Sequence, residues 1–135
     1  YKAWKGDLST DYSLLEAGLD RFIKFDKEID FRGKKALQVE QQRGSKKLFT
    51  ILKVSTNGCD APYMSTVWHN GEVVGEVTSG AWGYRVNSSI ALCMLKPELS
   101  KAGKVVEIEI YGQRCKATVH GQDPLWDPQN LRIRK

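Results

Sequence analysis

The chain has 135 residues, a net charge of +5 and 41% hydrophobic residues. This length favours one domain, or a small domain with an attached arm. No apolar run approaches the roughly 18 residues of a membrane-spanning helix, and no secretory signal opens the sequence, so a membrane partner is not expected. Because the sequence opens on Tyr1 rather than Met, we expect a fragment of a longer protein.

The first forty-odd residues differ in character from the rest. Residues 9–11 (Ser-Thr-Asp) offer side-chain oxygens for a turn or a helix N-cap ahead of residues 14–19. Residues 22–25 (Phe-Ile-Lys-Phe) predict a short strand. Residues 34–43 are rich in Lys, Ala, Leu, Gln and Glu and predict a helix, which Gly44 should end in the C′ position.

From Lys47 onward the pattern predicts strands. Residues 48–54 are apolar and β-branched, which favours a strand. Residues 65–69 and 72–78 flank Asn70-Gly71, a pair that tolerates the positive φ angles of a type I′ turn, so these segments predict a tight β-hairpin.

The last third predicts three more strands. One covers residues 89–95, and residues 105–110 and 113–119 should form a second hairpin around Tyr111-Gly112. In its first strand apolar residues alternate with Glu107 and Glu109, as in a half-buried strand. The expected fold is therefore mainly β, a six-stranded antiparallel barrel or jelly-roll-like domain preceded by a short α/β arm.

The cysteines and histidines do not predict a reactive site. Cys59, Cys93 and Cys115 are an odd number without Cys-x-x-Cys spacing, so we expect reduced thiols rather than disulfides or a zinc site. His69 and His120 each lack a second ligand at metal-binding spacing. No phosphate-binding loop or dinucleotide motif is present. The residues alone indicate no self-contained active site, and no catalytic residue or metal ligand is assigned.

The aromatic residues and the charge leave two questions open. Trp82 and Tyr84 flank a glycine in an expected loop, and we expect Trp82 and Trp126 to cover the barrel or a domain junction. Tyr1 and Trp4 lie three apart, and either stacking on a heterocycle or packing fits them. The basic residues are scattered rather than gathered in a stripe with interleaved aromatics, so nucleic acid is not expected, whereas an acidic ligand would suit a diffuse positive field.

Spaced motifs run along the whole chain in a fixed order. Those of the first third are Tyr1-Lys-Ala-Trp4, Asp7-Leu8 and residues 15–19, 24–27 and 31–37. Those of the remainder are residues 70–71, 74–80, 89–92, 96–103 and 126–132. With these motifs the chain resembles the C-terminal part of the glycine-cleavage T-protein (aminomethyltransferase) superfamily, in its dimethylglycine and sarcosine dehydrogenase branch.

The resemblance implies a C-terminal piece of a tetrahydrofolate-dependent aminomethyltransferase or dimethylglycine or sarcosine dehydrogenase, without its catalytic centre. In that family tetrahydrofolate lies in a cavity between three subdomains, and an upstream carboxylate assists attack of a folate nitrogen on a bound methylene group. Tyr1 matches a position that the family places beside the folate, and Trp4 is nearby. Both are therefore candidate cofactor-binding residues. FAD would belong to an upstream domain outside this sequence.

The resemblance also divides the chain and implies its partners. Residues 1–45 would end an α/β folate-binding subdomain, and residues 46–135 would form the C-terminal barrel that closes one side of the folate cavity. The implied partners are upstream domains of the same protein and small-molecule folate, with no nucleic acid and no membrane. The implied location is the cytoplasm of a bacterium or the mitochondrial matrix of a eukaryote. The oligomeric state and the substrate are not indicated.

Three departures from the family pattern stand out. Lys5 lies where the branch usually has glycine, with Gly6 one place later. Residues 83–89 lose a Gly-Lys pair. Leu131 stands where T-proteins tend to carry Tyr, so no folate contact is assigned there.

Two other classes of function stay open at this point. One is a non-catalytic regulator or accessory protein that retains the fold, as in a related phosphatase regulatory subunit. The other is an independent basic β-barrel that binds RNA. An upstream dinucleotide-binding motif together with the cavity carboxylate would distinguish the enzyme from the regulator.

Overall fold

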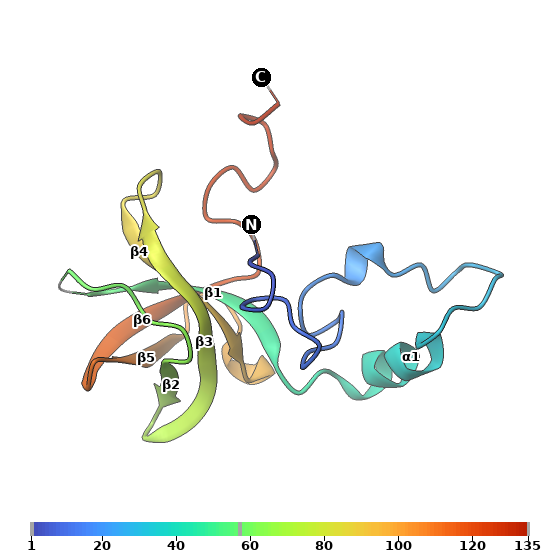
Figure 1. Ribbon diagram of the computed structural model, residues 1–135, viewed down its shortest axis with the longest axis horizontal. Helices are drawn as coiled ribbons and strands as arrows, with labels where there is room; N and C mark the ends of the chain where they lie inside the picture. The colour runs from blue at the N-terminus through green and yellow to red at the C-terminus, as the bar shows by residue number, and fades with distance from the viewer. Residues whose placement is uncertain (1, 57, 135) are drawn as a thin grey trace.

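A closed barrel, a projecting arm and a C-terminal tail after β6 make up the molecule (Figure 1). The structure, a computed structural model, describes residues 2–56 and 58–134. The barrel strands are β1 (Leu48–Val54), β2 (Thr66–His69), β3 (Glu72–Gly83), β4 (Ser88–Leu95), β5 (Val105–Ile110) and β6 (Gln113–Gly121). They are antiparallel neighbours in the order β1-β4-β3-β2-β5-β6. The predicted six-stranded antiparallel barrel is confirmed.

The barrel interior is filled by side chains that alternate along each strand. In β5, Val106, Ile108 and Ile110 are buried, whereas Val105 and Glu107 are exposed. The strands enclose one apolar cluster, whose fully buried members include Leu52, Val67, Val77, Ala91, Cys93, Leu95, Ile108 and Ala117. This period of two is what closing a sheet around one core requires.

Strand β1 differs because both of its faces are covered. Phe49 and Ile51 point away from the barrel interior and form a second cluster with Met94 of β4. Tyr12 of the arm and Leu125 of the C-terminal tail pack on this cluster. Cover on both faces explains why residues 48–54 read as a continuous apolar run rather than as an alternation.

The central residues of both hairpin turns adopt left-handed conformations, which Asn-Gly favours and which Tyr111 adopts although it is not a residue that favours them. Asn70 and Gly71 have φ angles of 51° and 82°, as the predicted type I′ turn requires. Tyr111 and Gly112, between β5 and β6, have φ angles of 48° and 80°. Both turns therefore match the right-handed twist of the strands that they join.

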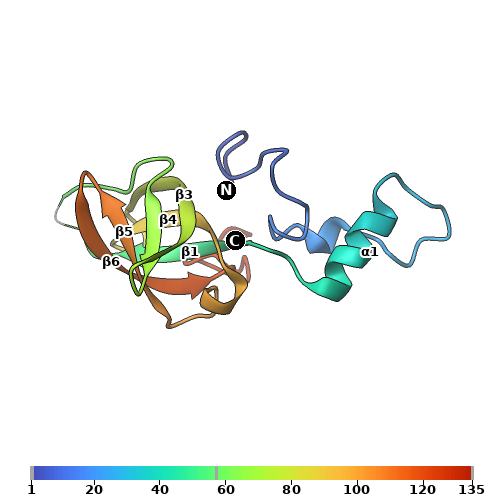
Figure 2. The same ribbon diagram turned by 90° about the horizontal axis from the view of Figure 1, so that it is seen from below.

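Residues 2–47 form the arm, which contributes no strand to the barrel. Helix α1 (Lys34–Arg43) ends at Gly44, as predicted, and Glu40 is its only buried residue. Figures 1 and 2 show α1 at the side of the molecule, away from the barrel. The short helix η1 (Asp20–Phe22) precedes it, and η2 (Pro97–Leu99) follows β4.

Two expectations about local structure were wrong. Residues 22–25 do not form a strand, because no strand lies beside them in the described chain, and Phe22 belongs to η1 with 66% of its surface exposed. Trp82 does not lie in a loop, because β3 continues to Gly83 and pairs there with β4. In both segments the presence or absence of a neighbouring strand determines whether a strand forms, and local composition does not.

Candidate functional site at the junction of arm and barrel

A buried carboxylate joins the start of the arm to the barrel. Asp7 is only 1% exposed. Its Oδ1 accepts hydrogen bonds from Thr78 Oγ1 at 2.5 Å and from Ser79 Oγ at 2.8 Å, both in β3. Its Oδ2 accepts one from the backbone N–H of Ala3 at 2.6 Å. Three donors around one carboxylate offset the cost of removing its charge from water.

A β-bulge in β3 makes this arrangement feasible. Val77 pairs with Cys93 and Ser79 pairs with Leu92, so Thr78 is an extra residue opposite β4. In a regular strand, consecutive side chains point to opposite faces of the sheet. A bulge removes this alternation locally, and here it lets two adjacent hydroxyls reach the same carboxylate.

The segment from Ala3 to Leu8 is a tight loop closed by its own backbone. Lys5 N–H donates to Leu8 O at 2.9 Å, and the amides of Asp7 and Leu8 both donate to Ala3 O. Lys5 has a φ of 69°, a conformation that favours glycine, at the position where the family pattern has glycine. Trp4 projects from this loop with 75% of its surface exposed.

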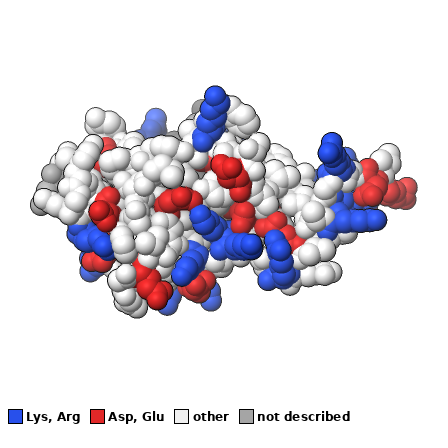
Figure 3. Space-filling model, turned by 60° about the horizontal axis from the view of Figure 1, so that its bottom comes forward, with Lys and Arg blue, Asp and Glu red and all other residues white. Residues whose placement is uncertain are grey.

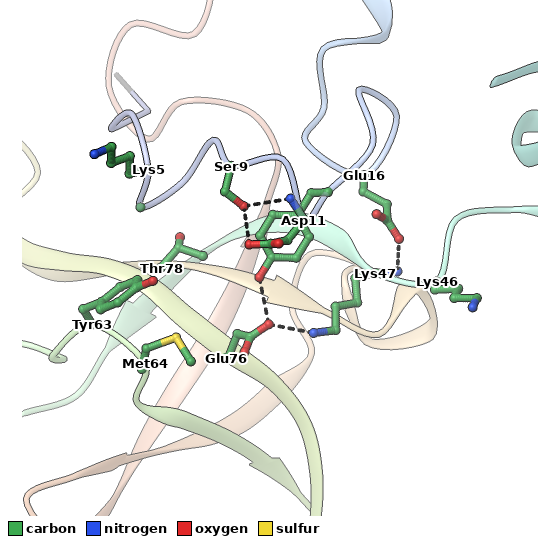
Figure 4. A pocket seen from close by; sticks show the side chains of 12 residues that line it. Lys5, Ser9, Asp11, Glu16, Lys46, Lys47, Tyr63, Met64, Glu76 and Thr78 are labelled. Atoms are coloured by element: carbon green, nitrogen blue, oxygen red, sulfur yellow. Dashed lines mark hydrogen bonds and ion pairs between the residues drawn. The ribbon is translucent and has the colours of Figure 1, made fainter. Parts of the chain in front are cut away.

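A second contact between arm and barrel is ionic. Glu76 of β3 accepts a hydrogen bond from Tyr12 Oη at 2.8 Å and one from Lys47 Nζ at 2.6 Å (Figure 4). The hydrogen bond from Lys47 is the main influence that lowers the pKa of Glu76, although partial burial opposes it. Burial, followed by the hydrogen bond to Glu76, raises the pKa of the Tyr12 phenol.

A polar network ties α1 to the same region. Ser13 Oγ and Ser45 Oγ both donate to Glu40 Oε1 at 2.7 Å. Ser13 and Glu16 exchange hydrogen bonds between side chain and backbone N–H, and Glu16 Oε1 also accepts from Lys47 N–H at 3.3 Å. This chain of contacts attaches an otherwise exposed helix to the first residues of the barrel.

An open pocket of about 440 Å³ lies between arm and barrel (Figure 4). Its lining consists of Lys5, Gly6, Ser9, Asp11, Tyr12, Glu16, Lys46, Lys47, Tyr63, Met64, Glu76 and Thr78. The three lysines balance the three carboxylates, and on the face shown in Figure 3 acidic and basic side chains are interspersed. The pocket wall itself therefore carries no excess of charge.

The structure describes one of the two candidate cofactor-binding residues, Trp4, but not the other, Tyr1. Trp4 does not line the pocket, but its neighbours Lys5 and Gly6 do. Tyr1 lies outside the described residues. The contacts of Asp7 with Thr78 and Ser79 were not expected from sequence, because 71 and 72 positions separate the partners. The sequence signal for them was that Asp7 lies in one family motif and that Thr78 and Ser79 lie in another, residues 74–80.

Other candidates from the sequence lie away from the junction. The guanidinium of Arg85 lies 4.4 Å from the centre of the Trp126 ring, and the expected covering role of Trp126 stays a prediction. The three cysteines are free, as expected, and burial raises the pKa of the Cys93 thiol. Residues 2–56 and 58–134 contain no cluster of three metal-ligating side chains. No described helix is long and apolar enough to cross a membrane.

Comparison with known proteins accounts for this architecture. Residues 46–127 match the family model of the glycine cleavage T-protein C-terminal barrel domain. The chain belongs to this family. The match begins two residues before β1 and continues beyond β6, so this T-protein barrel is the domain that the six strands form.

The resemblance extends beyond the barrel into the arm. Mitochondrial dimethylglycine dehydrogenase of Rattus norvegicus is 37% identical over 100% of this chain, and a probable aminomethyltransferase of Pyrococcus horikoshii is 38% identical over 90% of it. The chain spans only 16% and 30% of these relatives. The glycine cleavage system aminomethyltransferase T of Bartonella henselae shares the fold, with a TM-score of 0.78 at 24% identity over 86% of this chain and 33% of that one.

Proposed function

We propose that the chain is the C-terminal part of a tetrahydrofolate-dependent enzyme that demethylates dimethylglycine or a related N-methylated amine, or transfers the resulting one-carbon unit. The T-protein barrel and the similarity to dimethylglycine dehydrogenases over the whole of this chain support this proposal. The barrel and its arm would close one side of the folate cavity. Catalytic groups, and FAD if the enzyme uses it, would belong to the upstream part.

The exposed indole of Trp4 is the observation that carries the proposal. An aromatic ring with 75% of its surface exposed, on a loop attached through a buried carboxylate, is suited to stack on a flat heterocycle. The neighbouring Lys5 is exposed and cationic, which suits an anionic ligand tail. These residues fit tetrahydrofolate, which would supply the acceptor for the one-carbon unit, whereas Trp4 would orient its ring. Tyr1 is proposed beside it on the family pattern.

The arm supports the presence of an upstream partner within the same polypeptide. Phe22, Ile29 and Val39 are exposed by 66%, 81% and 56%, and α1 buries only Glu40. Three large exposed apolar side chains on an arm that buries so few of its own residues fit a surface that another part of the polypeptide covers. Their occupant in this proposal is the upstream α/β subdomain, as the length of the relatives suggests. The location would follow the relatives, in mitochondria or in the bacterial cytoplasm.

The test is to replace Trp4 in the full-length protein and to measure tetrahydrofolate affinity by calorimetry. Trp4→Ala should weaken binding by about 5- to 150-fold, the range of about 1–3 kcal/mol for losing an aromatic contact. Trp4→Phe should retain most of the affinity, because it keeps a stacking face. Trp82→Ala is the matched control, because Trp82 is also partly exposed but lies on β3.

The proposed Tyr1 contact is tested in the same assay. Tyr1→Ala should also weaken folate binding, and Tyr1→Phe separates loss of the hydroxyl from loss of the ring. Unchanged affinity in the Ala variants of both Trp4 and Tyr1, at an unchanged thermal midpoint, would refute the assignment of this wall of the cavity.

A further inference from the structure

We infer that Asp7 is a positioning residue, which fixes the Trp4-bearing loop on the barrel through the two hydroxyls of the Thr78–Ser79 bulge. Its consequence for ligand binding rests on the proposed function. Asp7 and its partners in β3 belong to separate parts of the sequence. The assignment therefore comes from the three-dimensional arrangement.

The first argument is that the loop has no other buried anchor. Among residues 3–10, Asp7 alone is buried, and Ala3, Trp4 and Lys5 are exposed. Leu8 is only partly buried, and a segment with so little apolar burial depends on specific polar contacts to keep a defined position. The contacts of Asp7 with Thr78 and Ser79 are the side-chain hydrogen bonds between this loop and the barrel in the described chain.

The second argument is geometric fit. Gly6 lies so close to β3 that a Cβ atom built on it would be 3.2 Å from the Thr78 carbonyl oxygen. The loop therefore lies directly against the bulge, and the carboxylate reaches both hydroxyls across a short distance. Bulges frequently re-aim side chains next to functional sites, and here the re-aimed groups face the carboxylate.

The third argument is backbone strain in the same loop. Lys5 adopts a φ of 69°, which a residue with a side chain keeps only when its surroundings enforce it. The enforcing contacts are the Asp7 hydrogen bonds on one side and the backbone hydrogen bonds from Ala3 to Leu8 on the other. Trp4 immediately precedes Lys5, so the direction of its side chain depends on this geometry.

The test compares Ser79→Val with Ser79→Thr in the full-length protein. The two new side chains have nearly the same shape, and only Thr keeps the hydroxyl that donates to Asp7. Amide hydrogen exchange of residues 3–8 reports loop mobility, and exchange in β5 reports the stability of the barrel. We expect Ser79→Val to raise loop exchange about tenfold and to weaken tetrahydrofolate binding several-fold, whereas Ser79→Thr leaves both near the parent values.

Asp7→Asn is the stronger variant. The amide can accept from the hydroxyls, but its NH₂ group then faces the Ala3 N–H, which is also a donor. Loop exchange should rise more than in Ser79→Val while exchange in β5 changes little. The matched control is Asp26→Asn, which removes a charge at an exposed position of the same arm.

The outcomes separate this inference from the proposed function. If loop exchange and folate affinity are the same in Ser79→Val and Ser79→Thr, and Asp7→Asn matches Asp26→Asn, Asp7 is not a positioning residue. If loop exchange rises as expected but folate affinity does not change in these variants or in Trp4→Ala, the loop is fixed by Asp7, and the folate role of Trp4 fails instead. If β5 exchange rises as much as loop exchange, Asp7 supports the whole fold and the inference is overturned.

Discussion

Glu76 of β3 is bound both by the arm and by the residue that precedes β1. Its carboxylate accepts hydrogen bonds from Tyr12 of the arm and from Lys47, which immediately precedes β1. Because both donors favour the ionised carboxylate, folding lowers the pKa of Glu76 despite its partial burial. The attachment of arm to barrel should therefore depend on pH.

The sign of this dependence follows from the lowered pKa. The pKa of a glutamate in an unfolded chain is about 4.3. The stability that Glu76 contributes is fully present above that pH and is lost as pH falls through its lower folded pKa. We expect the denaturant midpoint of the parent to fall more between pH 7 and pH 3 than that of Glu76→Gln.

The control for Glu76 is Glu98→Gln, since Glu98 is an exposed residue of η2. Its midpoint should follow that of the parent across the same pH range. Identical acid sensitivity of Glu76→Gln and the parent would show that the Glu76 contacts contribute nothing to stability.

At the residue scale, the sequence predicts the site only in part. Trp4 and Tyr1 are candidates because they belong to a family motif; Trp4 is 75% exposed, and its contact with folate stays a prediction. Asp7 was recognised only as a motif member, because its partners lie more than 70 positions away. No local pattern reveals a bulge that turns two adjacent hydroxyls toward one carboxylate.

At the scale of elements, hydrophobic periodicity was sufficient to predict the strands of the barrel. The alternation in β5 and the continuous apolar run of β1 were both visible in the sequence, and they correspond to one and to two covered faces. Helix α1 was predicted with its bounds because Gly44 ends it. Residues 22–25 have strand propensity but no partner strand, which is why propensity failed there.

The hairpin of β2 and β3 makes the clearest prediction at this scale. Gly71 has a φ of 82°, so Gly71→Val forces a β-branched side chain into the left-handed region. The free energy of unfolding should fall by about 1–3 kcal/mol, measured by urea denaturation. Asn70→Gly is the control, because glycine accepts the φ of 51° at that position. An unchanged midpoint in Gly71→Val would show that the turn does not need this geometry in solution.

At the scale of the whole molecule, arm and barrel differ in what stabilises them. The barrel has a continuous core of fully buried side chains. The arm has Glu40 and Asp7 as its buried anchors, together with Ala17, and it exposes Phe22, Ile29 and Val39. The sequence could not show this contrast, because α1 has the composition of an ordinary helix. What distinguishes α1 is that only one of its residues, Glu40, is buried. The arm should therefore open at lower free energy than the barrel when it has no partner.

This contrast predicts how the isolated chain of residues 1–135 behaves. The barrel should unfold cooperatively, with slow amide exchange in β1, β4 and β5, while α1 exchanges much faster because the surface that would cover it is absent.

The chain should show no turnover with dimethylglycine, sarcosine and tetrahydrofolate, since the proposed catalytic groups belong to the upstream part. Adding that part as a separate polypeptide should slow the exchange of α1 before any activity is recovered, because docking of the arm must precede closure of the cavity. Turnover by the isolated chain would overturn the proposal that the catalytic groups lie in the upstream part. Fast amide exchange of α1 in the full-length protein would overturn the proposal that the arm docks on that part.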